Sequence, residues 1–178
     1  MRAKTILACA ATLLVLVSAT ACKKEAPKAE NKGGVTWMNF TDGMKKAKAE
    51  GKPVIVDFYT QWCKYCKMMD DTTYKDPEVI KILSEGFVAI KVDAEGTASV
   101  VDPKGKQVTE AELAKGFNIT GYPTLFFFDA KGKPIGPIPG YSSPEDFRPA
   151  LTFITSGSYD KGIKYADYLK SLPKANTK

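Results

Sequence analysis

"PVIVDFYTQWCKYCKMMD", residues 53–70, joins a continuous apolar run to two cysteines three positions apart. The run is rich in β-branched residues and has the length of a strand that is buried on both faces. The residues after the first cysteine have helical character. This order predicts a strand that leads directly into a helix, with Cys63 and Cys66 in its first turn and close enough to form a disulfide.

Strand and helix signals alternate around this segment and predict an α/β fold. A short apolar stretch at 35–40 precedes a helix that Thr41 or Asp42 can cap. Asp76, followed by proline at the first helical position, opens a later helix. The buried strand "FVAIKVD" comes next at 87–93. Two buried strands joined by a helical crossover imply parallel pairing, so we expect a central mixed sheet with helices on both faces.

The second half of the sequence predicts a hairpin and further helices. "TLFFFDAKGKPIG" at 124–136 is typical of an antiparallel hairpin with its turn at 130–132, and "VVDPKGKQV" at 100–108 predicts a smaller extra hairpin. Helices are expected from Thr109 or Glu110, from Ser143 to about residue 156, and within 159–172. The last segment carries Tyr159, Tyr165 and Tyr168, which form either a partner surface or the inner face of a helix packed on the domain.

The N-terminal segment has the features of an export signal. Arg2 and Lys4 precede an apolar run at 5–17 that is too short to span a bilayer as a permanent helix. Small residues at 19–21 then supply a cleavage site. We therefore expect residues 1–21 to be a secretory signal peptide, with a retained N-terminal anchor as the alternative.

A lipid anchor and a tether are expected to follow this signal. "SATAC" at 18–22 is similar to the lipobox of bacterial lipoproteins, although Ala19 stands where leucine is usual. Without lipidation, Cys22 would be an unpaired thiol, which is a liability in an oxidising compartment. Residues 22–34 are charged and rich in Ala, Pro and Gly, as a flexible tether is. We expect an exported, periplasmic lipoprotein of a Gram-negative bacterium, anchored at Cys22.

Composition narrows the range of functions. The chain has 178 residues, 44% of them apolar, which suits one domain at 35–156 with a C-terminal helical extension at 157–178. Its net charge of +6 is not gathered into a basic stripe with stacking aromatics, so nucleic acid is not an expected partner. Histidine is absent, and a closed zinc site needs four ligands, so we expect no metal.

The cysteine pair is better suited to redox chemistry than to a structural role. A disulfide that encloses two residues removes little chain entropy. At a helix N-terminus, however, unpaired N–H groups and the helix dipole favour a thiolate, and Lys64 and Lys67 add positive charge. We expect Cys63 to be the exposed nucleophile and Cys66 to be more buried. The alternative is Cu(I) bound by both cysteines and Met69, whose usual role would be core packing.

Taken together, residues 35–156 resemble the thioredoxin superfamily. The resemblance rests on "VIVDFYTQWCKYC", "FVAIKVD", "GYPT" and "TLFFFDAKGK" in this order. The chain is similar to the C-terminal domain of transmembrane thiol:disulfide interchange proteins and to thioredoxins linked to sulfur oxidation. The resemblance implies a thioredoxin fold with an insertion before the cis-proline strand and an extra C-terminal helix. It also implies a thiol:disulfide oxidoreductase with no cofactor beyond a Cys63–Cys66 disulfide.

The resemblance also assigns roles within the cysteine site. Cys63 falls on the nucleophile and Cys66 on the resolving cysteine. Asp57 falls on the buried carboxylate that exchanges a proton with the second cysteine, which a raised pKa would allow. The alternative for Asp57 is an aspartate at a strand end that finds water or an N–H group.

A second set of residues is expected to contact the substrate. Pro123 falls on the cis-proline beside the disulfide, so the Tyr122–Pro123 bond is predicted to be cis, although trans bonds are commoner in general. The backbone of Tyr122 can then pair with an extended peptide. Trp62 matches the tryptophan before the first cysteine, where it either contacts substrate or simply packs.

The direction of electron flow depends on features that depart from the family pattern. A Lys-Tyr dipeptide separates the cysteines in place of Gly-Pro, which leaves the reduction potential open. We expect a monomeric reductase of protein disulfides that receives electrons from a membrane thiol/disulfide donor. The alternative is a disulfide oxidase or isomerase.

Overall fold

The computed structural model describes residues 34–172. The predicted signal peptide, Cys22 and nearly all of the predicted tether lie outside these residues. The helices are α1 (Phe40–Glu50), α2 (Lys64–Asp71), the short 3-10 helix η1 (Thr73–Lys75), α3 (Pro77–Gly86), α4 (Glu110–Gly116), α5 (Pro144–Thr155) and α6 (Tyr165–Ser171). The strands are β1 (Val54–Tyr59), β2 (Val88–Asp93), β3 (Ser99–Val101), β4 (Gln107–Thr109), β5 (Thr124–Phe128) and β6 (Pro134–Pro139).

Four strands form the central sheet in the order β2-β1-β5-β6. β1 runs parallel to β2 and antiparallel to β5, and β6 closes the sheet as the other arm of the predicted hairpin. The mixed sheet expected from the sequence is therefore confirmed. The short apolar stretch before the first helix forms no regular strand, because Met38 makes only an isolated bridge to Ile90 before α1 begins at Phe40.

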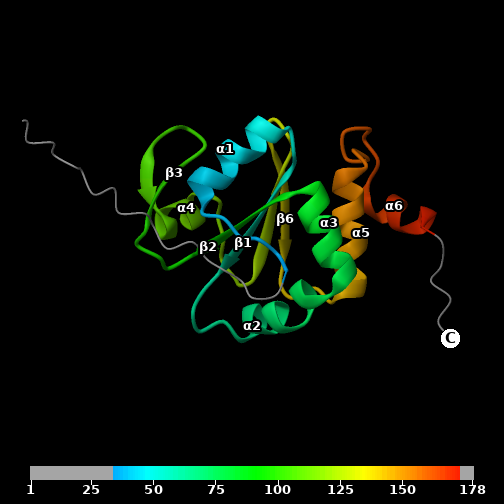
Figure 1. The fold of residues 1–178 in the computed structure, drawn as a ribbon, viewed down its shortest axis with the longest axis horizontal. Helices are drawn as coiled ribbons and strands as arrows, with labels where there is room; N and C mark the ends of the chain where they lie inside the picture. The colour runs from blue at the N-terminus through cyan, green and yellow to red at the C-terminus, as the bar shows by residue number, and fades with distance from the viewer. Residues whose placement is uncertain (1–33, 173–178) are drawn as a thin grey trace, which may run out of the picture.

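Helices lie on both sides of the sheet (Figure 1), and each side buries its own hydrophobic core. α3 and α5 cover one face, where Leu83, Phe147 and Leu151 are buried against Phe127. α1 and α4 cover the other, where Phe40 and other apolar side chains pack against β1 and β5. Because both faces are covered, β1 is a nearly continuous apolar run. Its single charge, Asp57, is therefore buried.

The helices begin after the predicted capping residues, with one exception. Asp76, Thr109 and Ser143 are N-caps, as expected. The cap of α1 is Asn39, not Thr41 or Asp42, and its side chain accepts a hydrogen bond from the Asp42 N–H at 2.9 Å. The helix begins early because Phe40 is part of its buried face and asparagine caps as well as aspartate does.

A small hairpin and a C-terminal helix are added to the four-stranded sheet and its covering helices. β3 and β4 form the small antiparallel hairpin that the sequence predicts before α4. In the C-terminal extension, α6 starts only at Tyr165, and that tyrosine and Tyr168 pack on Phe153 at ring distances of 5.3 and 5.1 Å. The Tyr168 hydroxyl also donates a hydrogen bond to Thr152. These contacts favour a helix packed on the domain over a free partner surface.

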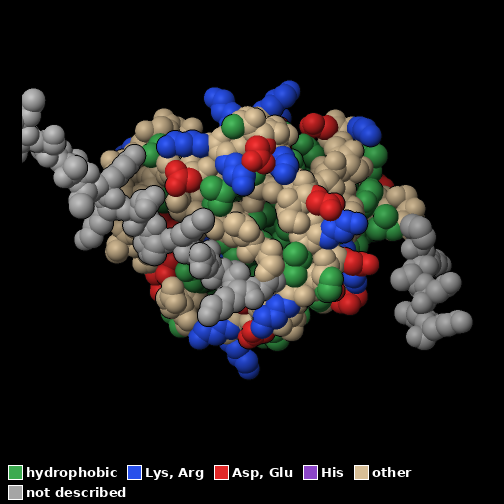
Figure 2. Space-filling model, in the orientation of Figure 1, with side chains coloured by type: hydrophobic (Ala, Val, Ile, Leu, Met, Phe, Trp, Pro, Cys, Tyr) green, Lys and Arg blue, Asp and Glu red, His purple; other side chains and the backbone are tan. Residues whose placement is uncertain are grey.

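The described surface is mixed in charge. Figure 2 shows basic and acidic side chains interleaved over the visible face, with no basic stripe across it. Within residues 34–172, every helix is too short or too polar to cross a bilayer.

Candidate active site

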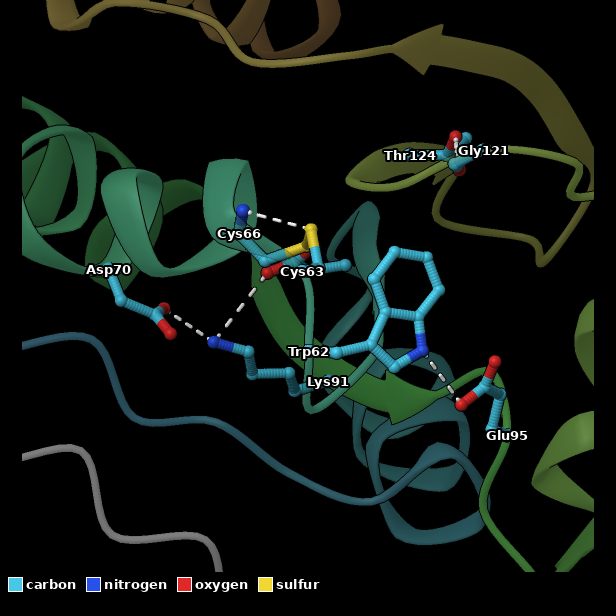
Figure 3. Close-up of a disulfide and its surroundings, with 9 residues drawn as sticks. Trp62, Cys63, Cys66, Asp70, Lys91, Glu95, Gly121 and Thr124 are labelled. Carbon is cyan, nitrogen blue, oxygen red and sulfur yellow. Dashed lines mark hydrogen bonds and ion pairs between the residues drawn. A yellow bond between two sulfur atoms is a disulfide. The ribbon is translucent and has the colours of Figure 1, made fainter.

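A disulfide joins Cys63 and Cys66 where β1 gives way to α2 (Figure 3). The two Cα atoms are 5.3 Å apart. Cys63 is the N-cap of α2, and its Sγ accepts a hydrogen bond from the Cys66 N–H at 3.0 Å. A backbone donor and the positive end of the helix therefore face this sulfur, as a thiolate at Cys63 would require.

The expected difference in exposure between the two cysteines is wrong. Cys63 and Cys66 are each only 3% exposed. Position along the helix alone predicts an exposed Cys63 and a buried Cys66. In the oxidised protein, however, the Cys63 side chain turns inward to cap the first helical turn and to bond with Cys66. A partner must therefore approach the sulfurs across the residues that surround them.

A buried charge cluster lies on the inner side of α2. The Lys91 Nζ atom on β2 is 3.7 Å from Asp57 Oδ2 on β1 and also pairs closely with Asp70 on α2. Figure 3 draws the ion pair between Lys91 and Asp70 as a dashed line. Asp57 is 1% exposed, and its Oδ1 has no hydrogen-bond partner among the described residues. Burial raises the pKa of Asp57 to about 6, although Lys91 opposes the rise; Asp70 adds to it.

Aromatic rings enclose the ammonium of Lys91. Its Nζ lies 5.4 Å from the ring centroid of Trp37, 5.1 Å from that of Tyr59 and 5.7 Å from that of Tyr74. Such contacts stabilise a desolvated cation. The sequence analysis missed Lys91 and its partner on α2. A signal was available, because a lone lysine in the strand "FVAIKVD" falls opposite Asp57 in a parallel register.

The predicted substrate-contact residues lie around the disulfide. The Tyr122–Pro123 bond is cis, as predicted. Trp62 is 66% exposed, which argues against a simple packing role. Its Nε1 donates a hydrogen bond to Glu95 at 3.0 Å, and its ring meets that of Tyr122 edge-on at 5.9 Å. Glu95, which the sequence analysis did not single out, thus holds the indole in place (Figure 3).

A groove of about 370 Å³ continues from the cis-proline loop. Residues 117–122 line one side, and Pro137, Pro139 and Gly140 line the other. The Thr124 hydroxyl fixes the loop by donating to the Gly121 carbonyl oxygen at 2.7 Å (Figure 3). The groove thus begins at Tyr122, the residue before the cis-proline.

Met69, the third ligand in the copper alternative, is fully buried. Its side chain is part of the core under α3 and α5. This burial favours the packing role over metal binding.

Comparison with known proteins extends this picture. Residues 40–155 match a family described as a thioredoxin-like domain. The "Thiol:disulfide interchange protein DsbD" of Escherichia coli K12 is 33% identical over 121 residues, which cover 63% of this chain and 20% of that protein. The chain thus spans about a fifth of that relative's length.

Two solved structures have a similar fold. A thioredoxin-fold protein from Helicobacter pylori is 25% identical, with a TM-score of 0.60 over 68% of this chain and 80% of that one. A thioredoxin from Thermus thermophilus is also 25% identical, with a TM-score of 0.60 over 73% of this chain and 94% of that one.

Proposed function

This chain belongs to the thioredoxin-like domain family and is a thiol-disulfide oxidoreductase, and from that premise we propose that it reduces protein disulfides in the periplasm. The observation that carries the proposed redox role is the buried Asp57 carboxyl with its raised pKa. Because such a group transfers protons in either direction of the exchange, the direction itself is tested by the reduction potential below. A group that titrates near neutral pH can exchange a proton with a thiol of similar pKa. The reducing reaction needs such a proton acceptor when the second cysteine attacks.

The proposed reaction starts from the dithiol form. The Cys63 thiolate attacks one sulfur of a substrate disulfide, forms a mixed disulfide, and releases the other substrate sulfur as a thiolate that takes up a proton. Cys66 then gives its proton to Asp57 and attacks the Cys63 sulfur. The intramolecular disulfide forms, the second substrate sulfur leaves as a thiolate and takes up a proton from water, and Asp57 returns the Cys66 proton to water. Two electrons and two protons pass to the substrate.

The residues around the sulfurs supply the substrate-binding part of the proposal. The exposed ring of Trp62 is available to a bound chain, and the backbone of Tyr122 can pair with it. Pro123 offers no N–H group of its own, so the hydrogen bonds at this edge come from its neighbour. We expect an extended segment of the substrate to lie along this loop and the groove beside it.

Reduction of the Cys63–Cys66 disulfide back to the dithiol requires an electron donor. We propose a membrane thiol/disulfide carrier, which the similarity to a thiol:disulfide interchange protein supports. We also propose that the protein is a monomer held at the membrane by a lipid on Cys22. Mass spectrometry of the mature N-terminus tests the lipid: an unmodified Cys22 would contradict it.

The equilibrium reduction potential of the Cys63–Cys66 pair tests the direction of the reaction. We expect a value near about −270 mV in glutathione or thioredoxin redox buffers, as for a reducing thioredoxin. The Cys63→Ser variant serves as the control and should lose turnover with protein disulfides. A potential near about −120 mV would mean that the protein is an oxidant and that the proposed direction is wrong.

A further inference from the structure

Two exposed aromatic side chains flank the buried disulfide. Trp62 is 66% exposed and Tyr65 is 56% exposed, more than the other large hydrophobic side chains that remain exposed in the described chain. One directly precedes Cys63 and the other directly precedes Cys66. Since both cysteines are nearly buried, these neighbouring rings are the exposed apolar surface closest in sequence to the sulfurs. Rigid exposed aromatics of this kind are typical anchors in protein interfaces.

The charged side chains beside these two rings are positive and unpaired. We call the edge formed by Trp62, Lys64, Tyr65 and Lys67 the rim. Lys64 and Lys67 are exposed in the first turn of α2 and make no ion pair with a described residue. The acidic residues of α2 are already engaged, because Asp70 pairs with Lys91 and Asp71 pairs with Lys75 at 2.7 Å. The helix N-terminus adds a partial positive charge beside both lysines.

The acidic groups on the other side of the disulfide are bound within the protein. Glu95 accepts a hydrogen bond from Trp62, and Asp93 accepts one from the Gln61 side chain at 3.1 Å. The edge of the site is therefore positive over α2, where the lysines are unpaired among the described residues, and negative beyond Trp62, where Glu95 and Asp93 keep their charges because their donors are neutral. This asymmetry specifies both the sign of a complementary partner charge and the side on which it belongs.

We propose that the redox partner is a protein disulfide flanked by acidic side chains, which lie over Lys64 and Lys67 while an apolar side chain contacts Trp62 and Tyr65. This inference rests on the proposed reducing function and names its substrate class. The electron transfer is unchanged: the partner disulfide gains two electrons and two protons, and Cys63 and Cys66 become a disulfide. The rim residues act when the partner binds, because complementary charge raises the rate at which the two proteins associate.

Two disulfide-bonded peptides of equal length test the inference, one with glutamate and one with lysine beside its cysteines. The second-order rate constant for oxidation of the reduced protein is measured with each. We expect the acidic peptide to react about fivefold faster at low salt, and we expect the preference to shrink in high salt. The ratio of the two rates cancels the intrinsic reactivity of the thiolate, which a charge change beside the cysteines would also alter.

Charge reversal on α2 should reverse this selectivity. Lys64→Glu/Lys67→Glu is expected to favour the basic peptide, and Lys67→Glu alone, outside the cysteine dipeptide, should lower the ratio about twofold. The control Lys81→Glu/Lys161→Glu makes the same net charge change at exposed lysines that form no ion pair with a described residue, and it should keep the wild-type ratio.

Each outcome bears on a distinct part of the argument. If the wild-type protein reduces both peptides at rates within twofold, the acidic-partner inference is overturned and the reductase proposal stands. If the control variant changes the ratio as much as the α2 variant does, net charge and not the rim decides, and the inference is again overturned. If neither peptide is reduced, the proposed function fails and this inference fails with it.

Discussion

The two sides of the Cys63–Cys66 disulfide differ in what their charges contact. On the buried side, Lys91 pairs both with the buried Asp57 and with the half-buried Asp70. On the exposed side, the lysines of the first turn of α2 have no partner among the described residues. From this difference we infer two kinds of control at one disulfide: the buried side acts on protons and stability, and the exposed side selects the molecule that approaches.

Replacement of the buried lysine should have the largest effect on stability. Lys91→Met removes the counter-charge of Asp57 and Asp70, so we expect the oxidised protein to lose about 3 kcal/mol of unfolding free energy at pH 7. Urea unfolding measures this loss. The matched control is Lys75→Met, which breaks the exposed pair with Asp71 and should cost about 0.5 kcal/mol or less. Equal losses of unfolding free energy in the two variants would show that the buried ion pairs stabilise the protein no more than the exposed pair does.

The pH dependence of stability should identify the buried carboxyl. The folded-state pKa of Asp57 is raised from 3.8 to about 6, so the unfolded chain ionises this group first. Its contribution therefore destabilises the folded state progressively as pH rises from about 4 to 6, and fully above that.

The Asp57→Asn variant removes this titration. Relative to the wild type, we expect it to gain about 3 kcal/mol of stability between pH 3.5 and pH 7, since each pKa unit corresponds to about 1.4 kcal/mol. Urea unfolding of both oxidised proteins across this pH range provides the measurement. A difference that stays constant with pH would show that Asp57 does not titrate as its burial indicates.

A smaller effect is expected on the exposed side. Glu95→Ala removes the acceptor that holds the Trp62 indole, and we expect kcat/KM for a disulfide peptide to fall about threefold while the unfolding free energy changes by less than about 1 kcal/mol. Glu95→Gln retains an acceptor and should stay near the wild-type rate. A similar fall in both variants would show that the charge of Glu95, and not its hydrogen bond, matters.

Much of the fold could be predicted from local sequence signals. The apolar run before Cys63, the capping pair Asp76-Pro77 and the 124–136 hairpin all form as expected. These features depend on residues close in the chain. The start of α1 was placed two or three residues late, because several neighbouring residues can cap a helix and only burial of Phe40 selects Asn39.

The candidate site also has some features that local motifs predict and others that depend on the tertiary structure. The cysteine pair and the cis Tyr122–Pro123 bond follow from motifs, and the structure contains both the disulfide and the cis bond. The exposure of Cys63 could not be predicted, since helical position says nothing about the direction in which a capping side chain turns. Lys91 was also missed, because its pairing with Asp57 joins strands more than thirty residues apart.

By itself, the sequence determined most of the order of strands and helices, the place of the CxxC pair at the start of a helix and the position of the carboxyl in β1. These depend on residue type, spacing and periodicity. Only the tertiary structure decided that Lys91 stands between two carboxylates, that both sulfurs are shielded, and that unpaired lysines remain at the rim. The physical reason is that burial and ion pairing are set by distances between segments remote in the chain, which local patterns do not encode.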